Sequence, residues 1–230
     1  MASEMVQENE ESDDGKEFVV RVLSSFMFIP LIFLLFLVHR NVFLALCWTT
    51  FGVMACEILS PKIRGKWPLR ALALAICFLG IVSFIHCRKF FGPLGCGFLI
   101  GIASFTDIGA YSFGKVLRGP KLCPKISPKK TWAGLMGGII LANVACFCAG
   151  YIFFRSSEYG VFWPKSAVNF WTVQAVILAS VLGDLLESTF KRKIEVKDMG
   201  DVFPGHGGIL DRLDSLILAS IVFTVIDILF

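Results

Sequence analysis

Paired cysteine motifs are absent from this 230-residue sequence. Its eight cysteines show no CxxC spacing, and most of them lie inside apolar stretches, among them Cys47, Cys56, Cys77, Cys96, Cys146 and Cys148. This distribution argues against a disulfide framework and against a zinc site. We interpret the cysteines as small buried hydrophobic residues. The chain also has no internal repeat and no linker long enough to separate domains, which favours a single bundle.

Charged residues are scarce as well, at 17% of the chain against 56% hydrophobic residues. This balance lies far outside the range of soluble domains and indicates an integral membrane protein. A membrane-spanning helix needs about 20 mostly apolar residues. Seven stretches meet that requirement: residues 18–38, 42–60, 69–87, 93–114, 133–154, 171–190 and 209–230. We therefore predict an all-α fold, a polytopic transmembrane helical bundle of about seven spans.

Acidic residues crowd the N-terminal tail, where residues 1–17 hold seven of the eighteen Asp and Glu residues. The tail has too few apolar residues to offset the entropy of ordering, so we expect it to be disordered. It lacks the basic region and the small-residue cleavage site of a signal peptide. We therefore expect the first span to be retained.

Basic residues are divided unevenly between the two sides of the predicted bundle. The loops after the second, fourth and sixth spans hold fourteen of them: Lys62, Arg64, Lys66, Arg70, Lys115, Arg118, Lys121, Lys125, Lys129, Lys130, Lys191, Arg192, Lys193 and Lys197. The loops after the first, third and fifth spans hold five: Arg40, Arg88, Lys89, Arg155 and Lys165. Because short cytoplasmic loops carry excess Lys and Arg, we predict a cytoplasmic N-terminus and an external C-terminus.

Several acids fall within or beside the apolar spans, where each carboxylate costs at least about 2.5 kcal/mol on insertion scales. For Glu57 and Asp227, near span ends, interfacial anchoring or a salt bridge is the favoured interpretation. The sixth and seventh spans differ, because each repeats an acid, acid, hydroxyl pattern at i, i+3 and i+4 on one helix face. The two sets are Asp184, Glu187 and Ser188, and Asp211, Asp214 and Ser215.

Carboxylate oxygens on two facing helices are suitable ligands for a hard divalent cation such as Mg²⁺. We predict a metal site formed by Asp184, Asp211 and Glu187, with Asp107 on the fourth span as a further contributor. The alternative is ion pairing of these acids with Arg212 and the nearby lysines.

A basic loop precedes the fifth span, with six cations between Lys115 and Lys130. It is either an orientation signal attracted to anionic headgroups or a phosphate site, and its three prolines favour a shaped loop. We choose Ser127, Lys129 and Lys130 as phosphate contacts. The stretch "GAYSFGKV" approaches a Walker loop, but Val116 replaces the Ser or Thr that would bind magnesium, so we reject that interpretation.

A glycine-rich turn, "FPGHGGIL", precedes the last span. Glycines allow backbone conformations and close approaches that side chains forbid, and a helix N-terminus offers N–H groups to anions. His206, Gly207 and Gly208 are therefore candidate phosphate or nucleotide contacts, with stabilisation of the turn as the alternative role for His206.

The stretch from residue 188 to residue 215, "STFKRKIEVKDMGDVFPGHGGILDRLDS", resembles the signature of phosphatidate cytidylyltransferases, also called CDP-diacylglycerol synthases. "DIGAYSFGK" and "KLCPKISPKKTWAGLMGG" resemble other segments of that family, so the similarity covers about residues 95–220. Two departures are present: the family often has an acid where this chain has Ala133, and the chain is short, which predicts one or two fewer N-terminal spans.

The resemblance implies a magnesium-dependent enzyme that joins CTP and phosphatidic acid to give CDP-diacylglycerol and pyrophosphate. It implies that Asp184 and Asp211 hold the metal, with Glu187 and Asp214 supporting them. Arg192, Lys197 and Arg212 would stabilise the triphosphate or the lipid phosphate, and Asp198 would orient these cations or bind a second ion. Ser188 and Lys191 would contact the substrate. The implied organisation is a tail over 1–17, N-terminal transmembrane helices over 18–92 and a catalytic transmembrane domain over 93–230.

The expected partners are CTP, phosphatidic acid and the membrane lipid bilayer, with no nucleic acid and with a homodimer as one option. The expected location is a bacterial cytoplasmic (inner) membrane, with the active site facing the cytoplasm. Two other functions stay open: a CTP-dependent lipid-alcohol kinase, and a cation-coupled transporter, since carboxylates inside the membrane also mark ion pathways.

Overall fold

The computed structural model describes residues 39–60, 67–124, 126–155, 169–196, 199–200 and 207–229. The chain divides into two compact units, residues 1–43 and 44–230. In the first unit the described residues are 39–43, of which 40–43 belong to helix α2 (Arg40–Leu59). The contacts that shape the candidate site all lie within the second unit.

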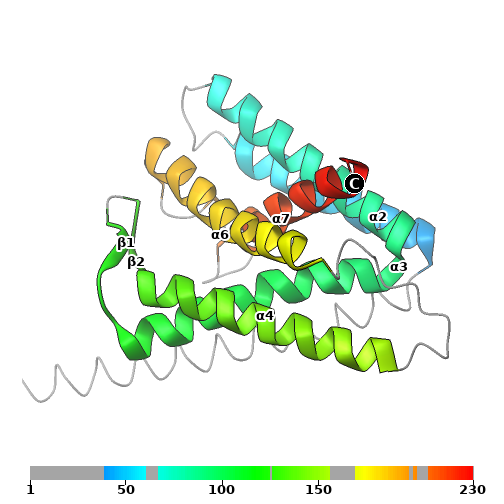
Figure 1. Cartoon of the computed structure of the whole chain (residues 1–230). Helices are drawn as coiled ribbons and strands as arrows, with labels where there is room; N and C mark the ends of the chain where they lie inside the picture. Colours follow the sequence, from blue (N-terminus) through cyan, green and yellow to red (C-terminus); the bar gives the residue numbers. More distant parts are fainter. Residues whose placement is uncertain are drawn as a thin grey trace, which may run out of the picture. The chain divides into compact units, whose positions relative to one another are not determined.

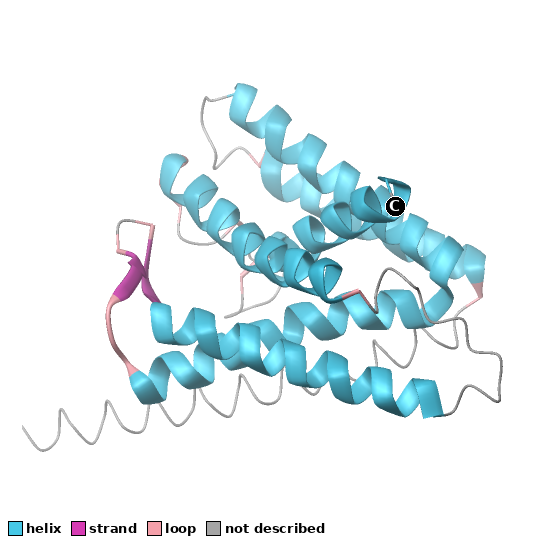
Figure 2. Ribbon diagram, viewed as in Figure 1, coloured by secondary structure: helices cyan, strands magenta, loops and turns pink. Residues whose placement is uncertain are grey.

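Helices form most of the described part (Figure 1). In chain order the elements are α2 (Arg40–Leu59), α3 (Trp67–Leu117), β1 (Lys121–Cys123), β2 (Ser127–Thr131), α4 (Trp132–Arg155), α6 (Phe170–Lys193) and α7 (Leu210–Leu229). The predominantly helical class is confirmed, and the predicted span at 18–38 lies outside the described residues. The short antiparallel hairpin of β1 and β2, in magenta in Figure 2, was not predicted.

Helix α3 is broken in the middle, at Gly92, where φ is 66° and ψ is −161°. This backbone conformation is open essentially to glycine, and Pro93 next to it has no N–H to donate. An unbroken helix of 51 residues would extend about 75 Å, far beyond the roughly 30 Å hydrocarbon core of a bilayer. The break turns α3 into two segments, which match the separate spans predicted at 69–87 and 93–114.

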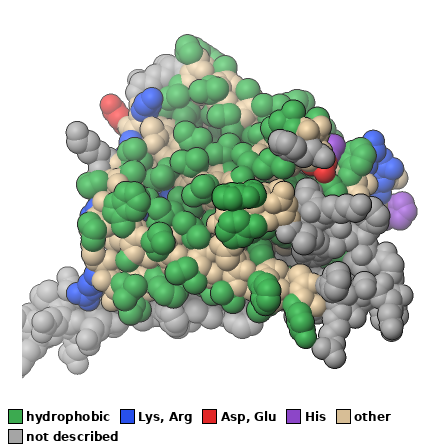
Figure 3. Space-filling model, in the orientation of Figure 1, with side chains coloured by type: hydrophobic (Ala, Val, Ile, Leu, Met, Phe, Trp, Pro, Cys, Tyr) green, Lys and Arg blue, Asp and Glu red, His purple; other side chains and the backbone are tan. Residues whose placement is uncertain are grey.

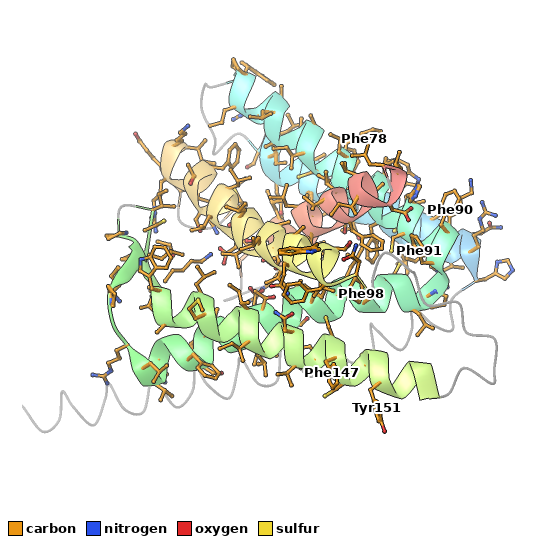
Figure 4. All side chains as sticks on the ribbon, in the orientation of Figure 1. Phe78, Phe90, Phe91, Phe98, Phe147 and Tyr151 are labelled. Carbon is orange, nitrogen blue, oxygen red and sulfur yellow. The ribbon has the colours of Figure 1, made fainter. Side chains whose placement is uncertain are left out.

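Four helices in the described part of the chain are long and apolar enough to cross a membrane: α2, α3, Trp132–Tyr151 of α4, and α6. Helix α7 carries three acids and an arginine in its 20 residues, which keeps it outside this group. Hydrophobic side chains cover much of the face seen in Figure 3. Phe147 and Tyr151 on α4, labelled in Figure 4, are 75% and 58% exposed, as expected for lipid-facing side chains.

Small residues let α4 approach the second segment of α3 closely. A Cβ added at Gly109 would lie 2.6 Å from the Gly137 carbonyl oxygen, and one at Gly138 would lie 2.7 Å from the Thr106 carbonyl oxygen. Side chains at these positions would force the helices apart, which is the packing expected for small residues in membrane helices.

The core lies where both segments of α3 meet α6 and α7. Phe223 of α7 packs against Phe91 and Phe98 of α3, with ring centroids 5.4 and 5.9 Å apart. A polar link joins α4 to α6, because Gln174 Nε2 donates to Asn143 Oδ1 at 2.6 Å. At the far end of α7 from the glycine turn, Asp227 pairs with His86 of α3 at 3.2 Å. These contacts fix α7 against its neighbours.

Candidate active site

Three carboxylates come together where the start of α7 meets α6. Asp184 and Glu187 lie one turn apart on α6, and Asp214 lies in the second turn of α7. One oxygen from each of the three lies within 4.8 Å of the others. The helices meet closely here because Gly183 has no side chain: a Cβ at that position would clash with the carbonyl oxygen of Asp214. We call Asp184, Glu187 and Asp214 the carboxylate group.

The carboxylate group has the composition expected of a site for a hard divalent cation. Its donors are all oxygens, which Mg²⁺ and Ca²⁺ prefer. Glu187 is 8% exposed, and its Oε1 atom is buried without a hydrogen-bond partner among the described residues. A buried, unpartnered carboxylate oxygen carries a large desolvation cost, which a bound cation would offset. The residues present therefore fit a divalent metal ion.

Two lysines contact the carboxylate group, each at a different acid. Lys130 Nζ lies 2.6 Å from Asp184 Oδ2. Lys191 Nζ lies 2.6 Å from Glu187 Oε2 and 3.0 Å from Asp211 Oδ1. Lys191 thus joins the acids of α6 to those of α7, and Lys130 joins the hairpin to α6.

The local sequence explains how Lys130 reaches the site. It lies at the end of β2, immediately before Thr131, whose Oγ1 accepts a hydrogen bond from Gly134 N at 3.0 Å. This is the geometry of a helix N-cap, so Thr131 sets the start of α4 and the position of the strand before it. Arg192 Nε donates to the Ile126 carbonyl oxygen at 3.5 Å, which links α6 to the turn of the hairpin.

Asp211 has a different environment from the carboxylate group. Its oxygens accept hydrogen bonds from Gly208 N at 2.7 Å and Met199 N at 3.1 Å, in addition to the contact with Lys191. Asp211 thus binds the backbone on both sides of residues 201–206, at Met199 and at Gly208. Its role as a metal ligand stays a prediction, while Asp214, expected only to support the site, lies in the carboxylate group.

Glu57 of α2 is part of this region, although the sequence favoured only an anchoring or salt-bridge role for it. Its Oε1 accepts from Ile209 N at 2.8 Å and its Oε2 accepts from Leu210 N at 3.0 Å. At the start of α7, the sequence suggested N–H groups open to a phosphate. In the structure Glu57 binds those of Ile209 and Leu210, and Asp211 binds that of Gly208. The one sequence signal for this contact was an acid inside the second apolar stretch.

The remaining candidates lie around the carboxylate group or outside the described residues. Asp107 on α3 interacts electrostatically with Asp184 and Asp214. Ser188 Oγ donates to Asp184 Oδ1 at 3.4 Å. Ser127 and Lys129 lie on β2. Gly207 and Gly208 precede α7, and Arg212 lies in its first turn. Lys197, Asp198 and His206 lie outside the described residues.

An apolar cavity of about 190 Å³ adjoins the carboxylate group. It lies between the first segment of α3, the C-terminal part of α6 and the start of α7. Glu187 and Asp214 are among its lining residues, and the others are mostly aliphatic, among them Leu72, Ala73, Ile76 and Leu218. A charged site thus borders an apolar one.

The sequence matches the cytidylyltransferase family over residues 65–230. The chain belongs to this family. It is 33% identical over 187 residues to a phosphatidate cytidylyltransferase of Brucella suis biovar 1 (strain 1330), a match that covers 81% of this chain and 66% of the relative.

Two further relatives carry the same name. A phosphatidate cytidylyltransferase of Rickettsia bellii (strain RML369-C) is 44% identical over 117 residues, which is 50% of this chain and 49% of that protein. One of Haemophilus influenzae (strain ATCC 51907 / DSM 11121 / KW20 / Rd) is 44% identical over 115 residues, covering 50% of this chain and 38% of the relative. The chain therefore spans about two thirds or less of the length of these cytidylyltransferases. The carboxylate group, the hairpin and α7 all lie inside the residues matched to the family.

Proposed function

We propose that this chain transfers the cytidylyl group of CTP to phosphatidic acid, giving CDP-diacylglycerol and pyrophosphate. The observation that carries the proposal is the carboxylate group, in which Glu187 Oε1 has no hydrogen-bond partner among the described residues, in a chain of the cytidylyltransferase family. The relatives' shared name supports the identity of the two substrates.

Asp184, Glu187 and Asp214 would hold Mg²⁺. The ion would supply positive charge that lets a triphosphate approach three carboxylates. Lys130 reaches the same place from the hairpin, and its ammonium group would neutralise phosphate charge beside Asp184. Lys191 holds Glu187 and Asp211 in position through two short ion pairs.

The reaction needs orientation more than acid–base chemistry. A phosphate oxygen of the lipid attacks the α-phosphorus of CTP, and the bond from that phosphorus to the oxygen bridging to the β-phosphate breaks. Pyrophosphate then leaves with the electron pair. Because the nucleophile is already an anion, no strong general base is required, and positioning with charge stabilisation carries the rate. Ser127, Lys129 and Arg192 beside the site are suited to contact the phosphates, and Lys197, Asp198, His206 and Arg212 keep the roles proposed from the sequence.

The apolar cavity beside Glu187 and Asp214 would hold part of an acyl chain of phosphatidic acid. At about 190 Å³ it is smaller than the roughly 300–1,000 Å³ of pockets that enclose drug-sized ligands, so only a section of one chain fits. The remainder of the lipid would stay in the bilayer. The lipid phosphate would then lie next to the carboxylate group.

We further propose that the chain crosses a bacterial inner membrane seven times, with the active site on the cytoplasmic side. The apolar helices and the excess of basic residues in the second, fourth and sixth loops support this topology. The cytoplasm is also where CTP would be available. A homodimer in the membrane is part of the same proposal.

A direct assay tests the proposed reaction. Protein purified in detergent is mixed with CTP, phosphatidic acid and Mg²⁺, and both pyrophosphate and CDP are measured. We expect pyrophosphate release that requires all three additions, together with a cytidylylated lipid. Release of CDP with a phosphorylated lipid alcohol would indicate a kinase instead, and transport of an unmodified substrate into sealed vesicles would indicate a transporter.

A further inference from the structure

We infer that Glu57 is a positioning residue of the active site, which holds the start of α7 in the place that the carboxylate group requires. This inference rests on the proposed function for its catalytic consequence, while its geometric basis is independent of it. Glu57 lies outside residues 65–230, the part of the chain matched to the family.

The carboxylate of Glu57 binds the N-terminus of α7 through both of its oxygens, to Ile209 N at 2.8 Å and to Leu210 N at 3.0 Å. The first N–H groups of a helix have no partner within the helix, and a negative charge there is favoured by the helix dipole. Glu57 is 6% exposed, so its carboxylate is buried where it meets these N–H groups. Backbone N–H groups therefore compensate the buried charge.

Two glycines on either side of residues 201–206 make room for this carboxylate. A Cβ at Gly200 would lie 2.7 Å from Glu57 Oε1, and a Cβ at Gly208 would lie 2.6 Å from the same atom. Any side chain at either position would displace Glu57. The two glycines are therefore explained by the position of Glu57 as well as by turn geometry.

The same region is also held by Asp211, which accepts hydrogen bonds from Met199 N and Gly208 N. The pair of acids, one from α2 and one from α7, thus fixes the backbone at 199–200 and at 208–210. Asp214 lies one helical turn after the residues that Glu57 binds. A shift in the start of α7 would move Asp214 away from Asp184 and Glu187, because one rigid helix carries both.

The first test compares Glu57→Gln with wild type. Asp227→Asn is the matched control, because it makes the same acid-to-amide change at another span-end acid, the one that pairs with His86 at the opposite end of α7. Gln retains one acceptor but brings an NH₂ group toward an N–H. We expect kcat/KM to fall about 10- to 100-fold and the Mg²⁺ concentration for half-maximal activity to rise. The control should keep both values.

Hydrogen exchange supplies a readout that does not depend on activity. The amides of Ile209 and Leu210 should exchange at least about tenfold faster in Glu57→Gln, while α6 is unchanged. Unchanged exchange would overturn the inference, and so would faster exchange with an unaltered kcat/KM in an active protein. If the wild type makes no pyrophosphate, the proposed function fails, and the exchange rates still decide whether Glu57 holds this turn.

A double-mutant cycle tests the close contact with Gly200. Gly200→Ala should lower the midpoint of thermal unfolding in the wild type, because its Cβ would overlap Glu57. In Glu57→Ala the side chain is gone, so the same substitution should cost little further stability. Additive losses would contradict the contact, since residues in direct contact show non-additive effects.

Discussion

Replacing Lys191 with Met should destabilise the protein strongly when no divalent cation is present. Lys191 Nζ pairs with Glu187 at 2.6 Å and with Asp211 at 3.0 Å, and the lysine, Glu187 and Asp211 side chains are 17%, 6% and 9% exposed. Breaking a buried ion pair by removing one partner typically costs about 3–5 kcal/mol, because the other charge stays buried without compensation. Here two acids lose one shared cation, so we expect a value in that range.

Thermal unfolding in detergent with a chelator measures this loss. For a chain of this size, 1 kcal/mol corresponds to about 2–4 °C, so the expected decrease in the unfolding midpoint is about 6–20 °C. Adding Glu187→Gln to Lys191→Met should recover part of the decrease, because it removes one of the two unpaired charges. A midpoint within about 2 °C of wild type, or strictly additive losses in the double variant, would refute the reasoning.

Two further predictions concern the substrates. Lys130→Met removes a partly exposed ion pair to Asp184 at 2.6 Å, so stability should change by only about 0–1 kcal/mol while the KM for CTP rises. A KM equal to wild type would argue that Lys130 does not contact the nucleotide. Ala73→Phe fills the apolar cavity, so activity should fall more with long-chain than with short-chain phosphatidic acid in mixed micelles. Equal losses with both lipids would show that the cavity does not hold an acyl chain.

Helix positions could be predicted from the sequence because membrane helices need long apolar runs. The predicted stretches 42–60, 133–154 and 171–190 match α2, α4 and α6 closely. The break between the two segments of α3 was also predictable, because Gly92 and Pro93 interrupt the apolar pattern. The hairpin was missed, since "KLC" and "SPKKT" are too short and too basic to show the alternation that identifies a strand.

The site was only partly predictable, because helix periodicity gives a shared face on one helix but no distances between helices. The i, i+3 spacing correctly placed Asp184 and Glu187 on one face of α6. On α7 the sequence analysis named Asp211 as a metal ligand and gave Asp214 a supporting role. In the structure Asp214 lies with the α6 acids, and Asp211 binds the backbone at Met199 and Gly208.

The contact of Glu57 with α7 could not be predicted from the sequence alone. The two elements are 152 residues apart where Glu57 meets Ile209, and no spacing rule links residues so distant. The sequence showed an acid inside an apolar stretch and glycines near residue 208. Only the fold shows that the Glu57 carboxylate packs against Gly200 and Gly208.

The most direct test of the central claim is Mg²⁺-dependent pyrophosphate release from CTP and phosphatidic acid by wild type and by Asp214→Asn, side by side. If the carboxylate group holds the metal, wild type releases pyrophosphate only with Mg²⁺, and Asp214→Asn loses most of that activity while remaining folded. Wild-type turnover that persists in a chelator, or an Asp214→Asn protein with a normal Mg²⁺ requirement and rate, would contradict the account.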